Sequence, residues 1–185
     1  ARTRFAKFTN LPELLKLYRS FADVQTSDMV KLDVPEAERQ VISLKPSDTT
    51  IELAEEIAER ADRIHDGHVD PHEDNMLKIT SDGKKLALDP RCFVPESQDE
   101  EESKLNECAQ RIFEVWTDTR DRKGTQIVFC DLSTPKVRFE DYEYGKDFDA
   151  YNGLKYKLVQ RGIPQEEIAY IHEANTDEQK QALFD

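Results

Sequence analysis

One short polar stretch of the chain holds three histidines with metal-ligand chemistry. They are His65, His68 and His72, with Asp66, Asp70, Glu73 and Asp74 among them. Imidazole nitrogens and carboxylate oxygens are ligands that zinc and nickel accept. However, Gly67 and Pro71 interrupt any helix that would aim the three rings at one ion. The pattern therefore favours a solvated turn over a functional metal site.

Asp131 is a candidate nucleophile by its position at the end of an apolar run. The order of residues 128–134 resembles the nucleophile segment of haloacid-dehalogenase phosphatases, in which one aspartate attacks phosphate and a second, two residues later, is the general acid. Ser133 stands where the second aspartate is needed. The resemblance implies a phosphatase with Asp131 as nucleophile, but the pattern fails at the residue that transfers the proton.

Cys130 and His172 offer a second nucleophile if the two segments lie in one sheet. Cys130 sits inside an apolar run, which favours an inert buried thiol. Neither glycine-rich phosphate-binding pattern, G-x-x-x-x-G-K-[ST] or G-x-G-x-x-G, occurs in the sequence. The chain alone is therefore expected to have no catalytic residue, cofactor or ATPase activity.

Composition limits the partners and the compartment. The 185 residues carry a formal net charge of −13, so the chain alone is expected to bind nucleic acid weakly. Cys92, Cys108 and Cys130 are widely spaced and are expected to be reduced thiols of a cytoplasmic protein. No apolar run has the length of a membrane helix and no signal peptide is visible, so no membrane partner is expected.

The hydrophobic pattern predicts an α/β fold. Thr125–Leu132 contains an unbroken apolar run, Ile127–Cys130, which is typical of a parallel strand covered on both faces. Ile168–Ile171 has the same character, and Arg39–Leu44 alternates as a strand should.

Helices are predicted between these strands. Their predicted ranges are 11–21, 50–66, 104–123, 148–161 and 177–184, with Ser103, Asp147, Thr49 and Thr176 as caps and Gly67 and Gly162 as terminators. Glu56–Arg60 and Glu59–Arg63 have the spacing of helical ion pairs. Residues 76–79 and 86–88 are two short apolar pieces around a turn at 81–83, and the acid-rich loop 95–102 is expected to be mobile.

Taken together, the order of elements resembles the Swi/Snf-type branch of superfamily-two helicases, whose two RecA-like lobes bind ATP and DNA between them. The resemblance covers most of the chain. It is carried by residues 14–21 with 28–35, 38–44 with the helix 50–66, 76–90, 103–116 with 126–130, and 170–184. More narrowly, Arg2–Phe8, Asp74–Thr80 and Phe129–Pro135 resemble the helicase part of large bacterial proteins from conjugative elements and phages, which often join a helicase to a DNA methyltransferase.

The resemblance implies an incomplete RecA-like second lobe. Residues 1–35 would be the end of the first lobe and the inter-lobe linker, residues 36–102 a first strand, long helix and helical insertion, and residues 103–185 the first half of the second lobe. The chain would then be a fragment of an ATP-dependent DNA helicase or translocase, inactive alone. ATP and magnesium would belong to the intact parent, and the partners would be DNA and the first lobe.

By the same resemblance, hydroxyl and amide groups at helix starts would contact the DNA backbone. The candidates are Ser133, Thr134, Lys136, Asn175 and Thr176. The sequence departs from the helicase pattern twice, at Ala22–Thr26, where a basic patch is usual, and at Glu173-Ala174, where Asp-Gly is usual.

A non-enzymatic module is the alternative. The acids of 96–102 and of the helix 52–62 would engage a basic protein, and the rest of the chain would be a scaffold.

Overall fold

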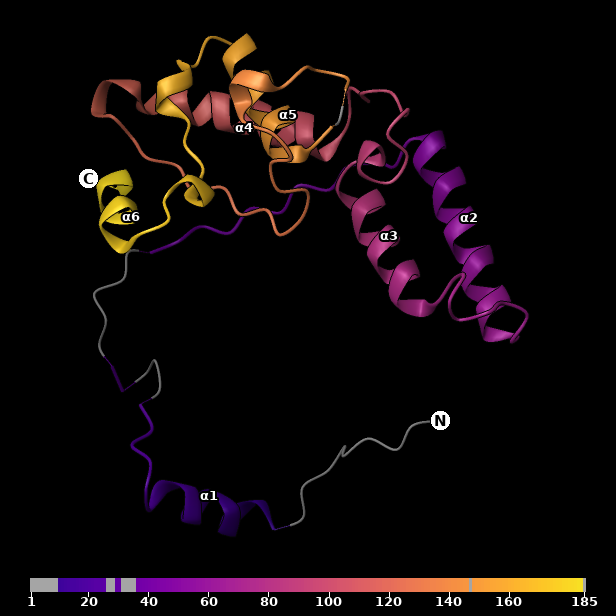
Figure 1. Cartoon of the computed structure of the whole chain (residues 1–185). Coiled ribbons are helices and arrows are strands. Elements are labelled where there is room, and N and C mark those ends of the chain that lie inside the picture. Colours follow the sequence, from indigo (N-terminus) through magenta and orange to yellow (C-terminus); the bar gives the residue numbers. More distant parts are fainter. Residues whose placement is uncertain (1–9, 26–28, 31–35, 147, 185) are drawn as a thin grey trace. The chain divides into compact units, whose positions relative to one another are not determined.

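The computed structural model describes residues 10–25, 29–30, 36–146 and 148–184 (Figure 1). The chain divides into two units, Ala1–Ile42 and Ser43–Asp185, which are treated separately below. The first contains α1 (Leu11–Arg19). The second contains α2 (Asp48–His65), α3 (Met76–Leu88), α4 (Lys104–Thr119), α5 (Ala150–Gln160) and α6 (Asp177–Phe184), joined by loops with short 3₁₀ turns. The predicted cap Asp147 lies outside the described residues.

The predicted α/β fold is wrong. No strand occurs among the described residues, so the structure contains neither the parallel sheet nor the RecA-like second lobe. Thr125–Leu132 has no regular structure, and Ile127 and Phe129 are 63% and 89% exposed. A strand needs a neighbour to accept and donate its backbone hydrogen bonds. The apolar run predicts a parallel strand, but no described segment pairs with it, so no strand forms there.

The two other predicted strands are also wrong. Arg39–Leu44 is irregular, and Val41 is 76% exposed. Ile168–Ile171 lies between two 3₁₀ turns, Gln165–Glu167 and Ile171–Glu173. The carbonyl of Ile168 accepts a hydrogen bond from Lys155 Nζ at 2.8 Å, a side-chain contact that replaces a strand partner.

Helices α2 and α3 pack as a pair around Ile57, Ile79 and Leu86. The predicted helix 50–66 is confirmed, but its cap is Ser47, whose Oγ accepts from the Thr50 N–H at 3.0 Å. Arg60 does not pair with Glu56 as predicted. It reaches Asp74 at 2.8 Å and Asp82 at 3.0 Å and so fastens α2 to α3.

The prediction of two short apolar pieces at residues 76–79 and 86–88 is also wrong. Met76–Leu88 is one continuous helix, not two apolar pieces around a turn. Asn75 Oδ1 caps its start by accepting from the N–H groups of Leu77 and Lys78. Gly83 stays within the helix, where a glycine costs up to about 1 kcal/mol relative to alanine. Burial of Ile79 and Leu86 on one face offsets that cost.

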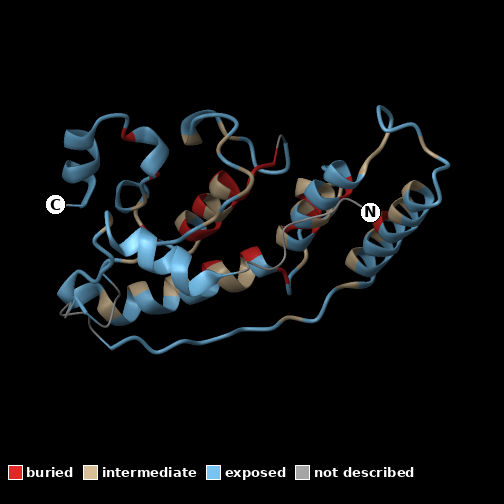
Figure 2. Ribbon diagram, turned by 90° about the horizontal axis from the view of Figure 1, so that it is seen from below, coloured by how far each residue is buried: buried red, intermediate tan, exposed pale blue. Residues whose placement is uncertain are grey.

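Helices α4 and α5 form the second pair, with Ala109, Leu158 and Ile163 between them. Ser103 caps α4 as predicted, and Gly162, with φ of 100°, follows α5 as predicted. Gly153 lets the Phe148 ring approach α5, since a Cβ there would lie 2.8 Å from that ring. The buried positions, red in Figure 2, are few and include a run on α5.

Candidate functional site

Buried charge is concentrated around α5 and the 3₁₀ turn Pro90–Cys92. The buried polar and charged residues there are Asp89, Arg91, Asp149, Asn152, Lys155 and Lys157. Ionised groups are rarely buried unless they are paired and hydrogen-bonded. This cluster is therefore the part of the structure whose chemistry most needs an explanation.

Arg91 is at the centre of the cluster. Asp89 Oδ1 and Oδ2 accept from Arg91 Nε and Nη2, each at 2.8 Å, and Asp89 Oδ1 also accepts from the Arg91 backbone N–H at 3.0 Å. The guanidinium lies 4.0 Å from the centre of the Phe148 ring. Two-point pairing and stacking on an aromatic ring are interactions that arginine makes and lysine does not.

Asp99 connects this arginine to α5. Its Oδ1 lies 2.9 Å from Arg91 Nη2, and its Oδ2 accepts from Lys157 Nζ and from the Tyr144 hydroxyl. Lys157 Nζ also contacts the Tyr144 hydroxyl at 3.0 Å. The acidic loop 95–102, predicted to be mobile, is thus held in place through Asp99. Asn106 adds a bond from its Nδ2 to the Glu100 carbonyl at 2.7 Å.

The pKa shifts follow from these contacts. Burial opposes the charge of Arg91, but its bonds to Asp89 and Tyr144 and the charge of Asp99 hold the pKa above its usual value. Burial likewise opposes the charge of Asp99. The bonds from Lys157 and Tyr144 nevertheless bring the pKa of Asp99 below its ordinary 3.8. The charges of Asp89, Arg91, Asp99 and Lys157 compensate one another, so these contacts order the structure around α5.

A second buried group lies at the start of α5. Asp149 Oδ1 caps the helix by accepting from the Asn152 N–H at 2.7 Å. Asp149 Oδ2 accepts from the Lys136 N–H at 3.2 Å and from Asn152 Nδ2 at 2.8 Å. Asn152 Oδ1 accepts from the Tyr170 hydroxyl at 3.2 Å. These bonds fasten residues 136 and 170 to α5.

The five predicted DNA contacts divide into two separate groups. Ser133 is half-buried, with φ of 58°, and its Oγ accepts from the Ala150 N–H at 2.8 Å, so it serves the start of α5. Thr134 and Lys136 beside it are exposed. Asn175 and Thr176 are exposed before α6, and their N–H groups donate to Gln179 Oε1. Within the described chain, no hydrogen bond or ion pair joins the two groups.

The candidate nucleophiles are not assembled into a catalytic arrangement. Asp131 is exposed, and Ser133, at the general-acid position of the phosphatase pattern, is used as a hydrogen-bond acceptor by α5. Cys130 Sγ contacts the Leu132 carbonyl at 3.2 Å. Tyr151 donates to the Cys130 carbonyl at 2.7 Å, while its ring packs edge-on against His172. Tyr151 therefore contacts both Cys130 and His172, the two residues of the candidate thiol–imidazole pair.

The histidine stretch is exposed, as the sequence suggested. His65, His68 and His72 all face solvent, and the His72 N–H donates to Asp70 Oδ1 at 2.8 Å. Among the residues that the structure describes, no three histidine, cysteine or acidic side chains are grouped as an ion would require.

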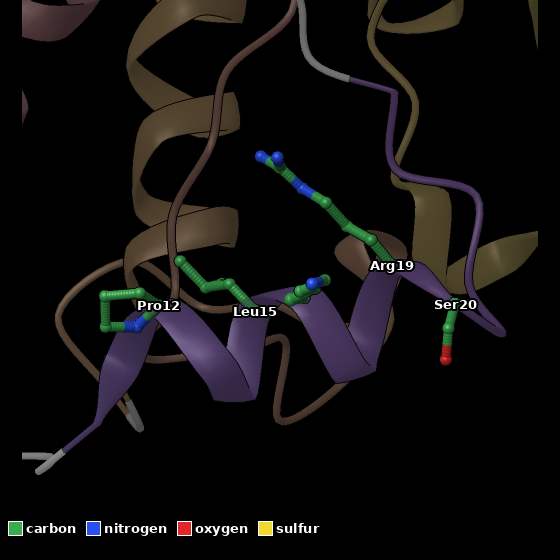
Figure 3. A pocket seen from close by; sticks show the side chains of 5 residues that line it. Pro12, Leu15, Arg19 and Ser20 are labelled. Atoms are coloured by element: carbon green, nitrogen blue, oxygen red, sulfur yellow. The ribbon is translucent and has the colours of Figure 1, made fainter.

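A shallow groove runs along one side of α1 (Figure 3). It is lined by Pro12, Leu15, Lys16, Arg19 and Ser20 and has a volume of about 550 Å³. Leu14 and Leu17 of the same helix are also exposed, as is Phe21 in the turn that follows it. The groove presents methylene groups, two cations and the Ser20 hydroxyl, which donates to the Leu17 carbonyl at 2.6 Å.

Comparison with protein-family models, with curated proteins and with solved structures found no match to this chain. No helix in the described part of the chain combines the length and the apolar character needed to cross a bilayer.

Sequence reasoning missed the cluster around Arg91. Asp89, Arg91 and Asp99 lie within eleven residues, but Tyr144 and Lys157 lie far along the chain. The available signal was Asp89-Pro90-Arg91, in which an aspartate before proline can accept from the backbone two residues later. Nothing in the pattern marked Lys157 as buried.

Proposed function

We propose that this chain is a non-catalytic part of an ATP-dependent DNA helicase or translocase of the Swi/Snf type. The observation that carries the proposal is the similarity of three separate stretches, Arg2–Phe8, Asp74–Thr80 and Phe129–Pro135, to the helicase part of large proteins of bacterial mobile elements. ATP and magnesium would be held by another part of that protein, in the bacterial cytoplasm. The helical structure described above replaces the RecA-like lobe as the framework for this role.

Within this role, Thr134 and Lys136 are the residues best placed to contact a DNA phosphate. Both side chains are exposed, and Lys136 offers a cation to a phosphate oxygen. The Lys136 backbone is held by Asp149, and its ammonium makes no ion pair within the described residues. The N–H groups of Asn175 and Thr176 donate to the Gln179 side chain.

The proposal is tested in the longer protein that it requires. DNA affinity is measured over a range of salt concentrations for Lys136→Glu and for a matched control, Lys146→Glu, whose exposed lysine pairs with Glu143. Loss of one phosphate contact lowers the salt slope by about 1 and weakens binding to all sequences alike. Equal effects of the two substitutions would remove Lys136 from the DNA contact.

The acidic surface of α2 favours a second candidate function, binding of a basic protein. Its exposed acids are Glu52, Glu55, Glu56, Glu59 and Asp62. None of them makes an ion pair within the described chain, since Arg60 turns to Asp74 and Asp82 instead. The triple variant Glu52→Gln, Glu56→Gln, Glu59→Gln is expected to lose affinity for a lysine-rich helical peptide. The control variant Glu140→Gln, Glu143→Gln, outside α2, is expected to keep it. Unchanged affinity in the first variant would exclude this surface.

A further inference from the structure

The three cysteines of the chain are far apart in sequence but lie near one part of the core. Cys92 and Cys130 both pack against one cluster of buried side chains, Leu105, Phe148 and Ala150. Cys108 lies on α4, one turn after Leu105. Burial raises the pKa of Cys92 and Cys108, and the charge of a Cys130 thiolate raises the pKa of both further. Cys130 therefore lies near the other two thiols, all of which are free.

The contacts favour Cys92 over Cys108 as the partner of Cys130. The Ser133 hydroxyl, three residues after Cys130, hydrogen-bonds the Cys92 side chain, so the two segments of chain meet at this point. Cys92 also shares the buried cluster with Cys130. In the described structure Cys108 is related to Cys130 by charge alone.

Cys130 is the thiol that an oxidant in solution reaches first. Its neighbours Phe129 and Asp131 are exposed, so the segment that carries it lies at the surface. The thiolate is the form of cysteine that reacts, and the raised pKa of Cys92 lowers the thiolate fraction of that residue at neutral pH. An accessible thiol beside a second thiol that can resolve its oxidised form is the arrangement of a redox-sensitive pair.

We propose that Cys130 is a site of oxidation by hydrogen peroxide and that Cys92 resolves the product as a reversible disulfide. The Cys130 thiolate attacks one peroxide oxygen. The S–O bond forms, the O–O bond breaks, and the departing hydroxide takes a proton and becomes water. The product is the sulfenic acid of Cys130.

The second step forms the disulfide. The Cys92 sulfur attacks the Cys130 sulfur, the S–S bond forms, and the S–O bond breaks. The hydroxyl group leaves as water with the proton of the Cys92 thiol. Over both steps each sulfur loses one electron and the two peroxide oxygens gain one each. A small-molecule thiol reverses the reaction by thiol–disulfide exchange, as a transient disulfide in a reducing compartment requires.

The disulfide joins two segments that position α5. One is the 3₁₀ turn Pro90–Cys92, whose Arg91 is the centre of the buried charge cluster. The other is the loop that leads to Ser133, whose Oγ accepts from the Ala150 N–H at the start of α5. Oxidation therefore fastens this loop to the charge cluster covalently.

The test is the disulfide map of the full chain after treatment with hydrogen peroxide, measured by mass spectrometry of non-reduced peptides. A Cys92–Cys130 disulfide is expected, with Cys108 still a thiol, and dithiothreitol should reverse it. The same treatment in urea is the control for the fold, because the preference of Cys130 for Cys92 should be lost there. A native chain that forms no intramolecular disulfide, or that joins Cys130 to Cys108, overturns the proposal.

Two substitutions test the roles of the two thiols. In Cys92→Ser the sulfenic acid of Cys130 should persist and be captured by dimedone, whereas the matched control Cys108→Ser should form the disulfide as the parent does. In Cys130→Ser the Cys92 thiol should stay reduced under the same treatment. Oxidation of Cys92 at the parent rate in Cys130→Ser would contradict the assignment of Cys130 as the first thiol to react. Circular dichroism of each variant confirms that the helices persist.

Discussion

Arg91 and Asp99 form an ion pair of 2.9 Å between the 3₁₀ turn that follows α3 and the acidic loop that precedes α4. Asp99 also contacts Lys157, so one carboxylate joins three segments of the second unit. A hydrogen bond to a charged group contributes about 1.5–3 kcal/mol, and removal of one partner leaves the other charges uncompensated.

Asp99→Asn is expected to lower the free energy of unfolding by about 2 kcal/mol, because Arg91 and Lys157 lose their shared counter-ion. Urea denaturation followed by circular dichroism measures the change. Glu101→Gln, in the same loop at an exposed acid, is the control and stays within about 0.5 kcal/mol of the parent. An Asp99 variant as stable as its control would show that the ion pairs contribute nothing to folding.

The acid stability of the chain should depend on the same residue. Because the folded-state pKa of Asp99 lies below its ordinary 3.8, the stabilisation is complete above that value and is lost as the pH falls through the lower folded-state pKa. Asp74, whose pKa is lowered by its bond to Arg60, acts in the same direction. Denaturation midpoints between pH 7 and pH 2 should fall less steeply in Asp99→Asn than in the parent. Parallel curves would contradict the assignment.

Gly83→Ala should stabilise the chain by about 0.5–1 kcal/mol, since the residue is helical and a Cβ there meets no atom within 4 Å. Gly162→Ala should destabilise the chain, because a backbone φ of 100° is unfavourable for any residue with a side chain. Thermal unfolding of the two variants should therefore shift in opposite directions. If both shift downward, α3 is interrupted at Gly83 as the sequence first suggested.

Asn152→Ala is expected to cost about 2 kcal/mol or more. Its buried amide bonds Asp149, the Val137 carbonyl and the Tyr170 hydroxyl. Asn152→Asp should be no better, since it replaces a donor with a second carboxylate beside Asp149. Chemical denaturation measures both. An Asn152→Asp variant as stable as the parent would mean that the Asn152 amide does not donate to Asp149.

Thiol labelling tests the packing of α4 and the 3₁₀ turn. Burial raises the pKa of Cys92 and Cys108, which lowers the thiolate fraction at neutral pH. Both should react with iodoacetamide at least tenfold more slowly in the native chain than in urea, as read by peptide mass spectrometry. Rapid native labelling of Cys108 would show that α4 is not packed as described.

The helices could be predicted from sequence more accurately than their assembly. Ser103, Gly162 and Thr176 mark helix ends through local chemistry, and each does so in the structure. The strand predictions were wrong because strand pairing is a long-range property. The apolar run in Thr125–Leu132 does not reveal which segment, if any, lies beside it in the fold. The buried cluster was unpredictable for the same reason, since Arg91 and Lys157 come to share Asp99 only in the folded chain.

The central claim is that this chain takes part in DNA-driven ATP hydrolysis without performing it. The most direct measurement is the ATP hydrolysis rate, with and without DNA, of the chain alone and of the longer protein containing both it and a nucleotide-binding segment. The account predicts no hydrolysis above background for the chain alone, and DNA-stimulated hydrolysis for the longer protein that falls with Lys136→Glu but not with Lys146→Glu. ATP turnover by the chain alone, or a longer protein whose hydrolysis does not respond to DNA, would contradict it.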